Sequence, residues 1–511
     1  MIVEGTFLSI LPPLVAIILC IILREAIVSL LLGIIVGAFL IYDFSISNAF
    51  FHAFDEIILE NFTKTDNAIV LIFTVLTGGV TGILSGSSTA KSLIARLATR
   101  LHSRSKTMLT IWFSGLLFFI DDYANCLIIG NAYRGICDRL KISREKLAYI
   151  VDTTSAPIAS LALVSTWIGI EISLINDSLA AQGVTEYTGY GLFIASIPYR
   201  FYPVLALFFC FMVAWTGRDF GPMRKSEQNV KDNIIDSEYD SDENAPVDGW
   251  SYLVFVPLLV LLFSSIVLLI SNGYSNGGTV DFKQPLQTLI SLFSNADPFR
   301  CLLWATLIAN VSSWVIHLGP LCESFSEVNK NWFKGCQGMF IVCAILTLAW
   351  SIGGVCVKLD TGAYVASLLG QDFNPVYLPL LTFIFAALIS FSTGTSYGTM
   401  SILMPIALPI ALTIGLDSPE IIQGVVGSVL GGSIFGDHCS PLSDTTILSS
   451  GASGCEVTSH VNTQLPYAIL VGGVSLVCLF LIPYQGMHVL VLTIGAAAVL
   501  TGALFLFGKK I

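Results

Sequence analysis

The chain has 511 residues, of which 54% are hydrophobic and only 12% are charged, and its formal net charge is −11 at pH 7. A soluble domain carries about 25% charged residues, so this composition excludes an ordinary soluble protein and is typical of a chain that faces lipid. The acidic balance argues against a nucleic-acid partner, which requires a basic face. The 12 Cys residues are scattered singly, which excludes a disulfide framework.

The apolar residues fall into segments of the length that a bilayer requires. A helix needs about 20 residues to cross the hydrocarbon core. Such segments lie near 7–23, 26–42, 68–86, 191–216, 250–271, 299–317, 337–355, 466–483 and 488–508. Four further apolar regions, at 107–133, 147–175, 376–413 and 419–455, are interrupted by polar residues. The sequence therefore predicts an all-α polytopic membrane protein, with a lipid bilayer as its surroundings.

The region 107–133 is predicted to enter and leave the membrane on the same side. It is flanked by two basic segments, 90–106 and 134–146, and the first of them is amphipathic, as is typical of an interfacial helix. Basic segments tend to stay in the cytoplasm. A re-entrant hairpin that turns near Asp121–Asn125 keeps both segments inside. The alternative is a single crossing, which would leave one basic segment outside.

The second half repeats this arrangement with the flanking charge reversed. The region 376–415 has the run STGTS (392–396) near its middle and acidic flanks at 356–375 and 416–420. These flanks are expected on the outer side, so the region predicts a second hairpin that enters from outside. Two halves of opposite orientation form an inverted-topology repeat, a common architecture of secondary transporters.

The predicted repeats divide the chain into three parts. The first repeat spans 1–216, an acidic cytoplasmic linker that we expect to be mobile and solvated spans 217–249, and the second repeat with an extra C-terminal helix spans 250–511. About 11 spans and two hairpins result. We expect a multi-pass protein of a bacterial inner (cytoplasmic) membrane with its C-terminus in the cytoplasm, and a homodimer among its assemblies.

Each hairpin is followed by an apolar segment that should break near the middle of the membrane. Ser143 can cap a helix that reaches Asp152 after a rise of roughly 13 Å, and Pro157 then interrupts it because proline lacks a backbone donor. In the second half, Pro419 suits a first helical position, and a glycine-rich helix reaches the run DHCSPLSDTT. Four polar breaks are expected to converge, at 121–125, 152–157, 393–396 and 437–445.

The residue types at these breaks suit a small hard cation. Carboxylates, hydroxyls and unwound backbone carbonyls supply the oxygen ligands that such ions prefer. Placing a carboxylate in hydrocarbon costs at least about 2.5–3.5 kcal/mol, so we expect the carboxylates at these breaks to have a functional role. Competition between Na⁺ and H⁺ for one carboxylate is the minimal mechanism of exchange. The candidate ion- or substrate-binding residues are Asp121, Asp122, Asn125, Asp152, Thr153, Thr154, Ser155, Thr393, Thr395, Ser396, Asp437, His438, Ser440, Asp444 and Thr445.

Among these candidates, Asp152 and Asp437 are the expected Na⁺ ligands, and each candidate has a structural alternative. Asp121 and Asp122 are adjacent, so only one is expected to point into a site. Asp444 can equally cap the helix that follows it. The hydroxyls and the amide can simply satisfy helix ends, and His438 can relay protons or be a hydrogen-bonded structural residue.

The sequence also predicts the surroundings of two charged side chains outside the breaks. Glu171 lies toward the outer end of its segment, where we expect it to face water. Arg200, in the run PYRFYP, can pair with a carboxylate or extend its charged end toward the membrane surface, and we favour the second.

Four sequence runs resemble one transporter family. The runs GGSIFGDHCSPLSDTTILSS (431–450) and GCEVTSHVNTQLPYA (454–468) resemble the signature region of the NhaC-type sodium/proton antiporter family. The runs FIDDYANCLIIGNA (119–132) and VDTTSAPIASLALVSTWIG (151–169) look like the same family's motifs in the first repeat. The resemblance spans nearly the whole chain and places it in the broader ion-transporter superfamily, whose members use two hairpins and two broken helices.

The resemblance implies Na⁺/H⁺ antiport by alternating access, with Na⁺ and H⁺ as transported ions and no resident cofactor. Similar proteins include malate/lactate exchangers and presumed amino-acid carriers, so the alternative is Na⁺- or H⁺-coupled transport of a small organic acid or amino acid. A membrane enzyme or a channel is a third class. The chain has no HExxH or GxSxG motif, and its polar residues form localised breaks rather than a continuous stripe, so we expect no enzyme.

Overall fold

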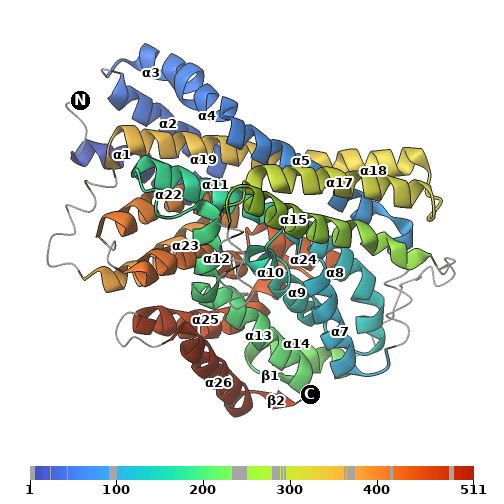
Figure 1. The fold of residues 1–511 in the computed structure, drawn as a ribbon. Helices are drawn as coiled ribbons and strands as arrows, with labels where there is room; N and C mark the ends of the chain where they lie inside the picture. Colours follow the sequence, from blue (N-terminus) through green and yellow to red (C-terminus); the bar gives the residue numbers. More distant parts are fainter. Residues whose placement is uncertain are drawn as a thin grey trace.

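The computed structural model describes residues 6–23, 25–42, 44–90, 101–232, 250–278, 288, 292, 295–361, 364, 374–414, 418–482 and 488–510. Within these ranges the fold is almost entirely helical, as predicted (Figure 1). The described β structure is one antiparallel pair of two-residue strands, β1 (Arg218–Asp219) and β2 (Lys509–Lys510).

The first half of the chain begins with two apolar helices and continues through helices of varied length. Its α-helices are α1 (Leu11–Leu23), α2 (Ala26–Ile41), α3 (Ile46–His52), α4 (Leu59–Thr63), α5 (Thr65–Gly86), α7 (Arg104–Leu117), α8 (Asp122–Arg139), α9 (Arg144–Thr153), α10 (Ala156–Leu161), α11 (Thr166–Ala181), α12 (Gly189–Ser196), α13 (Phe201–Thr216) and α14 (Gly221–Asp232).

The second half contains longer helices. They are α15 (Val256–Ser275), α17 (Pro298–Leu318), α18 (Phe325–Gly338), α19 (Phe340–Lys358), α21 (Leu378–Thr393), α22 (Ser396–Ile414), α23 (Pro419–Cys439), α24 (Asp444–Ser453), α25 (Val457–Leu481) and α26 (Val489–Phe507). In both halves a helical hairpin (α7–α8 or α21–α22) precedes an interrupted helix (α9–α10 or α23–α24).

Many of these helices have the length and composition of membrane spans. In the described ranges, 8 helices are long and apolar enough to cross, or up to 10 if the bent pairs α9–α11 and α12–α13 each count as one span. Helices α1 and α2 are apolar but shorter, and α21 and α22 of the second predicted hairpin are each long enough to cross. The chain is therefore a multi-pass membrane protein, while the inverted orientation of its two halves stays a prediction.

The helix ends coincide with the predicted polar breaks. α7 ends at Leu117 and α8 begins at Asp122. α21 ends at Thr393, where Gly394 has a left-handed φ of +68°, a conformation that glycine adopts without steric cost. α9 ends at Thr153 with Pro157 in the first turn of α10. α23 runs on to Cys439, so the last break lies at 440–443, toward the C-terminal part of the predicted stretch.

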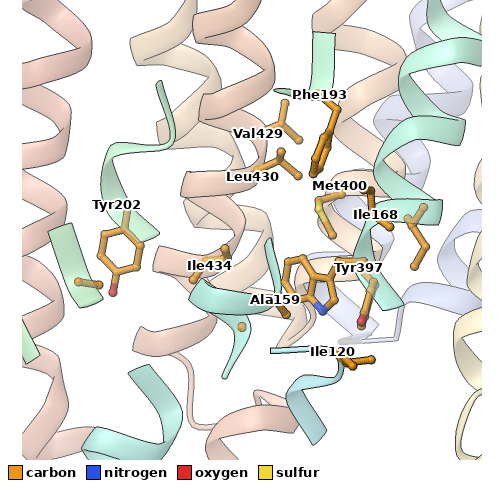
Figure 2. Packing of buried hydrophobic residues seen from close by; sticks show 14 of the residues in the cluster. Ile120, Ala159, Ile168, Phe193, Tyr202, Tyr397, Met400, Val429, Leu430 and Ile434 are labelled. Carbon is orange, nitrogen blue, oxygen red and sulfur yellow. The ribbon is translucent and has the colours of Figure 1, made fainter. Parts of the chain in front are cut away.

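Packing brings the four breaks together. α24 packs against α8 and α9, and α23 packs against both α21 and α22. α11 packs on α22, and Figure 2 shows Ile168 of α11 beside Met400 and Tyr397 of α22 in the buried core. The hairpin of each half therefore contacts the interrupted helix of the second half, and polar residues far apart in sequence meet in the centre.

The expected exposure of Glu171 and the favoured surface position of Arg200 were wrong, whereas the alternative that Arg200 pairs with a carboxylate is confirmed. Both side chains are 0% exposed, and Arg200 Nη1 lies 3.0 Å from Glu171 Oε2. Arg200 also donates to the backbone oxygens of Ser160 and Phe193 and lies over the Phe193 ring. The segment 197–203 turns into the protein between α12 and α13, so the guanidinium reaches buried acceptors rather than the membrane surface.

The predicted mobile linker is ordered over its described part. Residues 233–249 lie outside the described residues, but β1 and α14 pack against the body, where buried Asp219 accepts hydrogen bonds from Lys146 and, at 2.7 Å, from Tyr467. Glu227 accepts from Arg104 and, at 2.6 Å, from the backbone of Ser143. Asp219 and Glu227 are thus held against the body by hydrogen bonds, so a mobile, fully solvated linker is wrong for this part.

Other predicted segments fall partly outside the described residues. In the amphipathic basic segment 90–106, residues 91–100 lie outside them. So do residues 362–363, 365–373 and 416–417 of the predicted acidic flanks of the second hairpin.

Candidate functional site

A small pocket lies where the polar breaks meet, which we call the carboxylate pocket. Two helices, α21 and α23, end beside it, and four, α8, α11, α22 and α24, begin there. The breaks at 121–125, 393–396 and 437–445 all contribute to its wall. Its lining residues are Asp122, Tyr123, Trp167, Thr395, Ser396, Tyr397, Asp437, Asp444 and Thr445.

Three carboxylates give this pocket a negative character. Asp122 and Asp437 are 2% and 3% exposed, whereas Asp444 is exposed, so the pocket opens past Asp444. Asp437 Oδ2 accepts from the Thr445 hydroxyl at 2.8 Å, and Asp444 Oδ2 accepts from the Tyr123 hydroxyl at 3.0 Å. No Lys or Arg is among the lining residues. Carboxylates without a basic partner in a buried pocket favour a bound cation.

The two adjacent aspartates have different positions. Asp121 is the N-cap of α8, and its Oδ1 accepts from the backbone N–H of Ala124 at 2.7 Å. Asp122, in the first turn of the same helix, lines the carboxylate pocket. The structure therefore places Asp121 in a capping position and directs Asp122 to the pocket.

Asp152 lies in a neighbouring buried cluster. Its Oδ2 accepts from Gln464 Nε2 at 2.6 Å and lies 3.5 Å from His460 Nε2 and from the Thr446 hydroxyl. Thr446 follows Thr445, which bonds Asp437, so the first turn of α24 lies between the two carboxylates. Asp152 and Asp437 thus belong to adjacent hydrogen-bond clusters, and the Na⁺ site predicted at the two together stays a prediction.

A second small pocket lies on the other side of this cluster. His438 Nδ1 is 2.9 Å from the Tyr202 hydroxyl, and its backbone oxygen accepts from Gln464 at 3.0 Å. The lining of this pocket includes His438, Tyr202 and Gln464, together with Thr153. His438 is therefore a buried, hydrogen-bonded residue beside Asp152 rather than a lining residue of the carboxylate pocket.

The remaining predicted residues mostly satisfy helix ends. Thr154 donates to Ile150 O at 2.8 Å and Ser155 donates to Asp152 O at 2.6 Å, so both hydroxyls cap the end of α9. Thr393 accepts from the backbone of Thr395 at 3.4 Å, and Ser440 accepts from the backbone of Leu442 at 3.2 Å. Of the predicted hydroxyls, Thr395, Ser396 and Thr445 line the carboxylate pocket.

Asn125 joins two of the breaks. Its Nδ2 donates to the backbone oxygens of Gly115 and Thr154, both at 2.7 Å, and so ties the end of α7 to the gap between α9 and α10. This contact fixes the first hairpin against the segment that carries Asp152.

Replacing Asn125 by Leu is expected to destabilise the protein by about 1–3 kcal/mol, because the buried carbonyl oxygen of Thr154 would lose the donor Asn125. The carbonyl oxygen of Gly115 would keep the backbone N–H of Phe118 as a donor. Thermal or denaturant unfolding in detergent measures this change. Asn131→Leu on the same helix is the matched control, since Asn131 is exposed and donates only to Leu127 O, and it should shift stability by less than about 0.5 kcal/mol. Equal losses for both variants would contradict the role of Asn125.

Several residues of the site were not found from the sequence. His460 and Gln464 lie one turn apart on α25 and both face Asp152, and the aromatic residues Tyr123, Trp167 and Tyr397 line the carboxylate pocket. The run 454–468 carries the first two at a spacing of four residues ahead of Pro466, a signal that one helix face is polar. Nothing local indicates that the three aromatic residues converge.

The described parts of the chain contain no group of three or more His, Cys, Asp or Glu positioned to hold a metal ion. The carboxylate pocket combines carboxylates with hydroxyls, which are the oxygen ligands that hard cations prefer.

Comparisons with known proteins point to the same class. The family described as the Na⁺/H⁺ antiporter family matches residues 158–482. The chain is 32% identical over 466 residues to an uncharacterized protein of Haemophilus influenzae, covering 91% of this chain and 88% of that protein. It is 35% identical over 129 residues to the malate-2H⁺/Na⁺-lactate antiporter of Bacillus subtilis, covering 25% and 26% of the two chains.

A solved structure shares the fold. The YdaH transporter of Alcanivorax borkumensis superimposes with a TM-score of 0.59 over 86% of this chain and 90% of that chain, at 18% sequence identity. With a family match over more than half of its length and helices suited to span a membrane, the chain belongs to the Na⁺/H⁺ antiporter family and is a multi-pass secondary transporter.

Proposed function

We propose that the carboxylate pocket is the place where Na⁺ and H⁺ compete during antiport. The observation that carries this proposal is the presence of three carboxylates, Asp122, Asp437 and Asp444, around one pocket with no basic residue in its wall. A cation there replaces the missing counter-charge, and a proton on a carboxylate removes the need for it. Binding of one ion therefore displaces the other.

The geometry supplies separate steps for this exchange. Asp444 stands at the open end, where it can receive an arriving cation, and Asp437 lies in the buried part. Asp437 also lies in the last turn of α23, where the carbonyl ends of the helix favour positive charge. The Thr445 hydroxyl donates to Asp437 and can instead turn its oxygen toward Na⁺.

Alternating access requires that this pocket opens to each side in turn. The second hairpin contacts the start of α24 through the backbone, where Asp444 N–H donates to Gly394 O at 3.3 Å. A movement of the hairpin relative to α24 would change access past Asp444. The bacterial sources of the relatives support a cytoplasmic membrane as the location, and the predicted topology supports a cytoplasmic C-terminus.

Coupled transport of a small organic acid or amino acid is the second candidate. Ser396 Oγ favours it, because this hydroxyl lines the carboxylate pocket and has no hydrogen-bond partner among the described residues. The name of the malate/lactate relative also supports an organic cargo, over the part of the chain that it matches.

Competition makes the Na⁺ dependence a function of pH. In proteoliposomes, lowering the pH by one unit on the side where Na⁺ is added should raise the apparent KM for Na⁺ by up to about tenfold, because tenfold more protons compete for the same carboxylates. The maximum rate should stay the same at saturating Na⁺. A KM for Na⁺ that does not change over two pH units would contradict a shared site.

A further inference from the structure

The carboxylate pocket has three aromatic side chains in its wall. Tyr123, Trp167 and Tyr397 come from α8, α11 and α22, and the ring centroids of Trp167 and Tyr397 are 4.9 Å apart. Trp167 and Tyr397 are 1% and 5% exposed, and Figure 2 shows Tyr397 within the buried core below Met400. Aromatic faces attract organic cations through the ring quadrupole, most strongly where water is excluded.

A hydroxyl in the same wall lacks a partner. Ser396 is 5% exposed, and its Oγ makes no hydrogen bond within the described parts of the chain. An N–H donor from a bound molecule would satisfy this oxygen. A sodium ion needs only oxygen ligands, so the combination of aromatic side chains with an unpartnered hydroxyl and carboxylates suits a cation that also carries carbon and N–H groups.

We propose that the carboxylate pocket also binds a small organic cation with a primary ammonium head, in competition with Na⁺. The ammonium N–H groups would donate to the carboxylates of Asp437 and Asp444 and to Ser396 Oγ, while the attached carbon lies against the Trp167 and Tyr397 rings. This proposal rests on the proposed function of the pocket and narrows the class of its organic cargo to amines.

The volume of the pocket and its negative charge both limit the class of ligand that it can bind. The pocket as described has room for about one water-sized group, which matches an ammonium head rather than a large solute. A solute whose only charged group is a carboxylate would face three carboxylates without a basic partner and would be repelled. Methylammonium is therefore the simplest probe, and acetate is the probe that should fail.

The test is exchange of ²²Na⁺ for Na⁺ in strongly buffered proteoliposomes without a pH gradient. External methylammonium chloride should inhibit exchange at concentrations within about tenfold of the KM for Na⁺, whereas N-methylglucamine chloride and sodium-free acetate should not. No exchange at all in the wild type would overturn the proposed function. Normal exchange that methylammonium leaves unchanged would overturn only the ammonium site.

Matched variants separate binding from a general loss of structure. Ser396→Ala should raise the half-inhibitory methylammonium concentration, relative to the KM for Na⁺, by about tenfold, since a hydrogen bond to a charged group is lost. Ser428→Ala is the control, because Ser428 Oγ on α23 is equally buried and unpartnered but lies outside the pocket lining. The proposal would be contradicted if the half-inhibitory methylammonium concentration, relative to the KM for Na⁺, were the same in both variants.

A second pair tests the aromatic wall. Trp167→Leu should raise the ratio of the half-inhibitory methylammonium concentration to the KM for Na⁺ by about tenfold or more, because it removes a desolvated aromatic side chain. Trp350→Leu removes an equally buried indole from α19, outside the pocket lining, and should leave the ratio unchanged. If Trp167→Leu does not fold, the serine pair decides the question alone.

Discussion

Replacing Asp437 by Asn is expected to lower Na⁺-dependent proton flux in proteoliposomes by about 30-fold or more. The side chain is 3% exposed, lines the carboxylate pocket and accepts a hydrogen bond from the Thr445 hydroxyl. Removing one partner of a buried charge pair costs about 2–5 kcal/mol, and 1.4 kcal/mol corresponds to a tenfold change. The amide keeps the shape of the carboxylate but can neither neutralise Na⁺ nor carry an exchangeable proton.

Asp177→Asn is the matched control for this change. Asp177 lies on α11, is half-buried and does not line the carboxylate pocket, so its variant should retain flux within about threefold of the wild type. Asp437→Glu keeps the charge and should retain part of the flux. If the folded Asp437→Asn variant shows the flux of the wild type, Asp437 does not belong to the transport site.

Replacing Arg200 by Met is expected to cause a large loss of stability. Arg200 and Glu171 form an ion pair in which both side chains are 0% exposed, and Arg200 also satisfies the Ser160 and Phe193 carbonyls. Breaking a buried ion pair from one side costs about 3–5 kcal/mol, because the remaining charge is left unpaired. Denaturant unfolding followed by circular dichroism measures the loss.

Two further variants identify the cause of this loss. The double variant Glu171→Gln with Arg200→Met should recover part of the stability, because it removes the unpaired charge. Arg300→Met is the control, since Arg300 pairs with Asp297 at an exposed site and its loss should cost less than about 1 kcal/mol. If Arg200→Met unfolds no more easily than Arg300→Met, the buried pair does not stabilise the fold.

The sequence predicted the helical class and the four breaks because both depend on local signals. Apolar runs mark the helices, and the proline at 157, the glycine at 394 and the polar run at 437–446 mark where helices end. The order and packing of these breaks depend on contacts across hundreds of residues. Such contacts include those of α8 with α24, which no local pattern specifies.

The candidate site was predicted in part for the same reason. Asp122, Asp437 and Asp444 line one pocket, as expected for carboxylates at convergent breaks, but Asp152 belongs to a neighbouring cluster through Gln464 and His460. A carboxylate in an apolar segment indicates that it needs a hydrogen-bonding or charged partner. The sequence does not show which residue that partner is. The burial of Arg200 and the order of α14 were missed because charge alone predicts exposure, whereas matched opposite charges allow burial.

Simultaneous recording of ²²Na⁺ uptake and luminal pH in proteoliposomes tests the central claim most directly. With Na⁺ added outside and no imposed gradient of protons, the wild-type protein should take up Na⁺ while the lumen becomes alkaline, and Asp437→Asn should do neither. Uptake of Na⁺ by the wild type with no movement of protons, in the presence of a potassium ionophore that clamps the membrane potential, would contradict antiport at a shared carboxylate pocket.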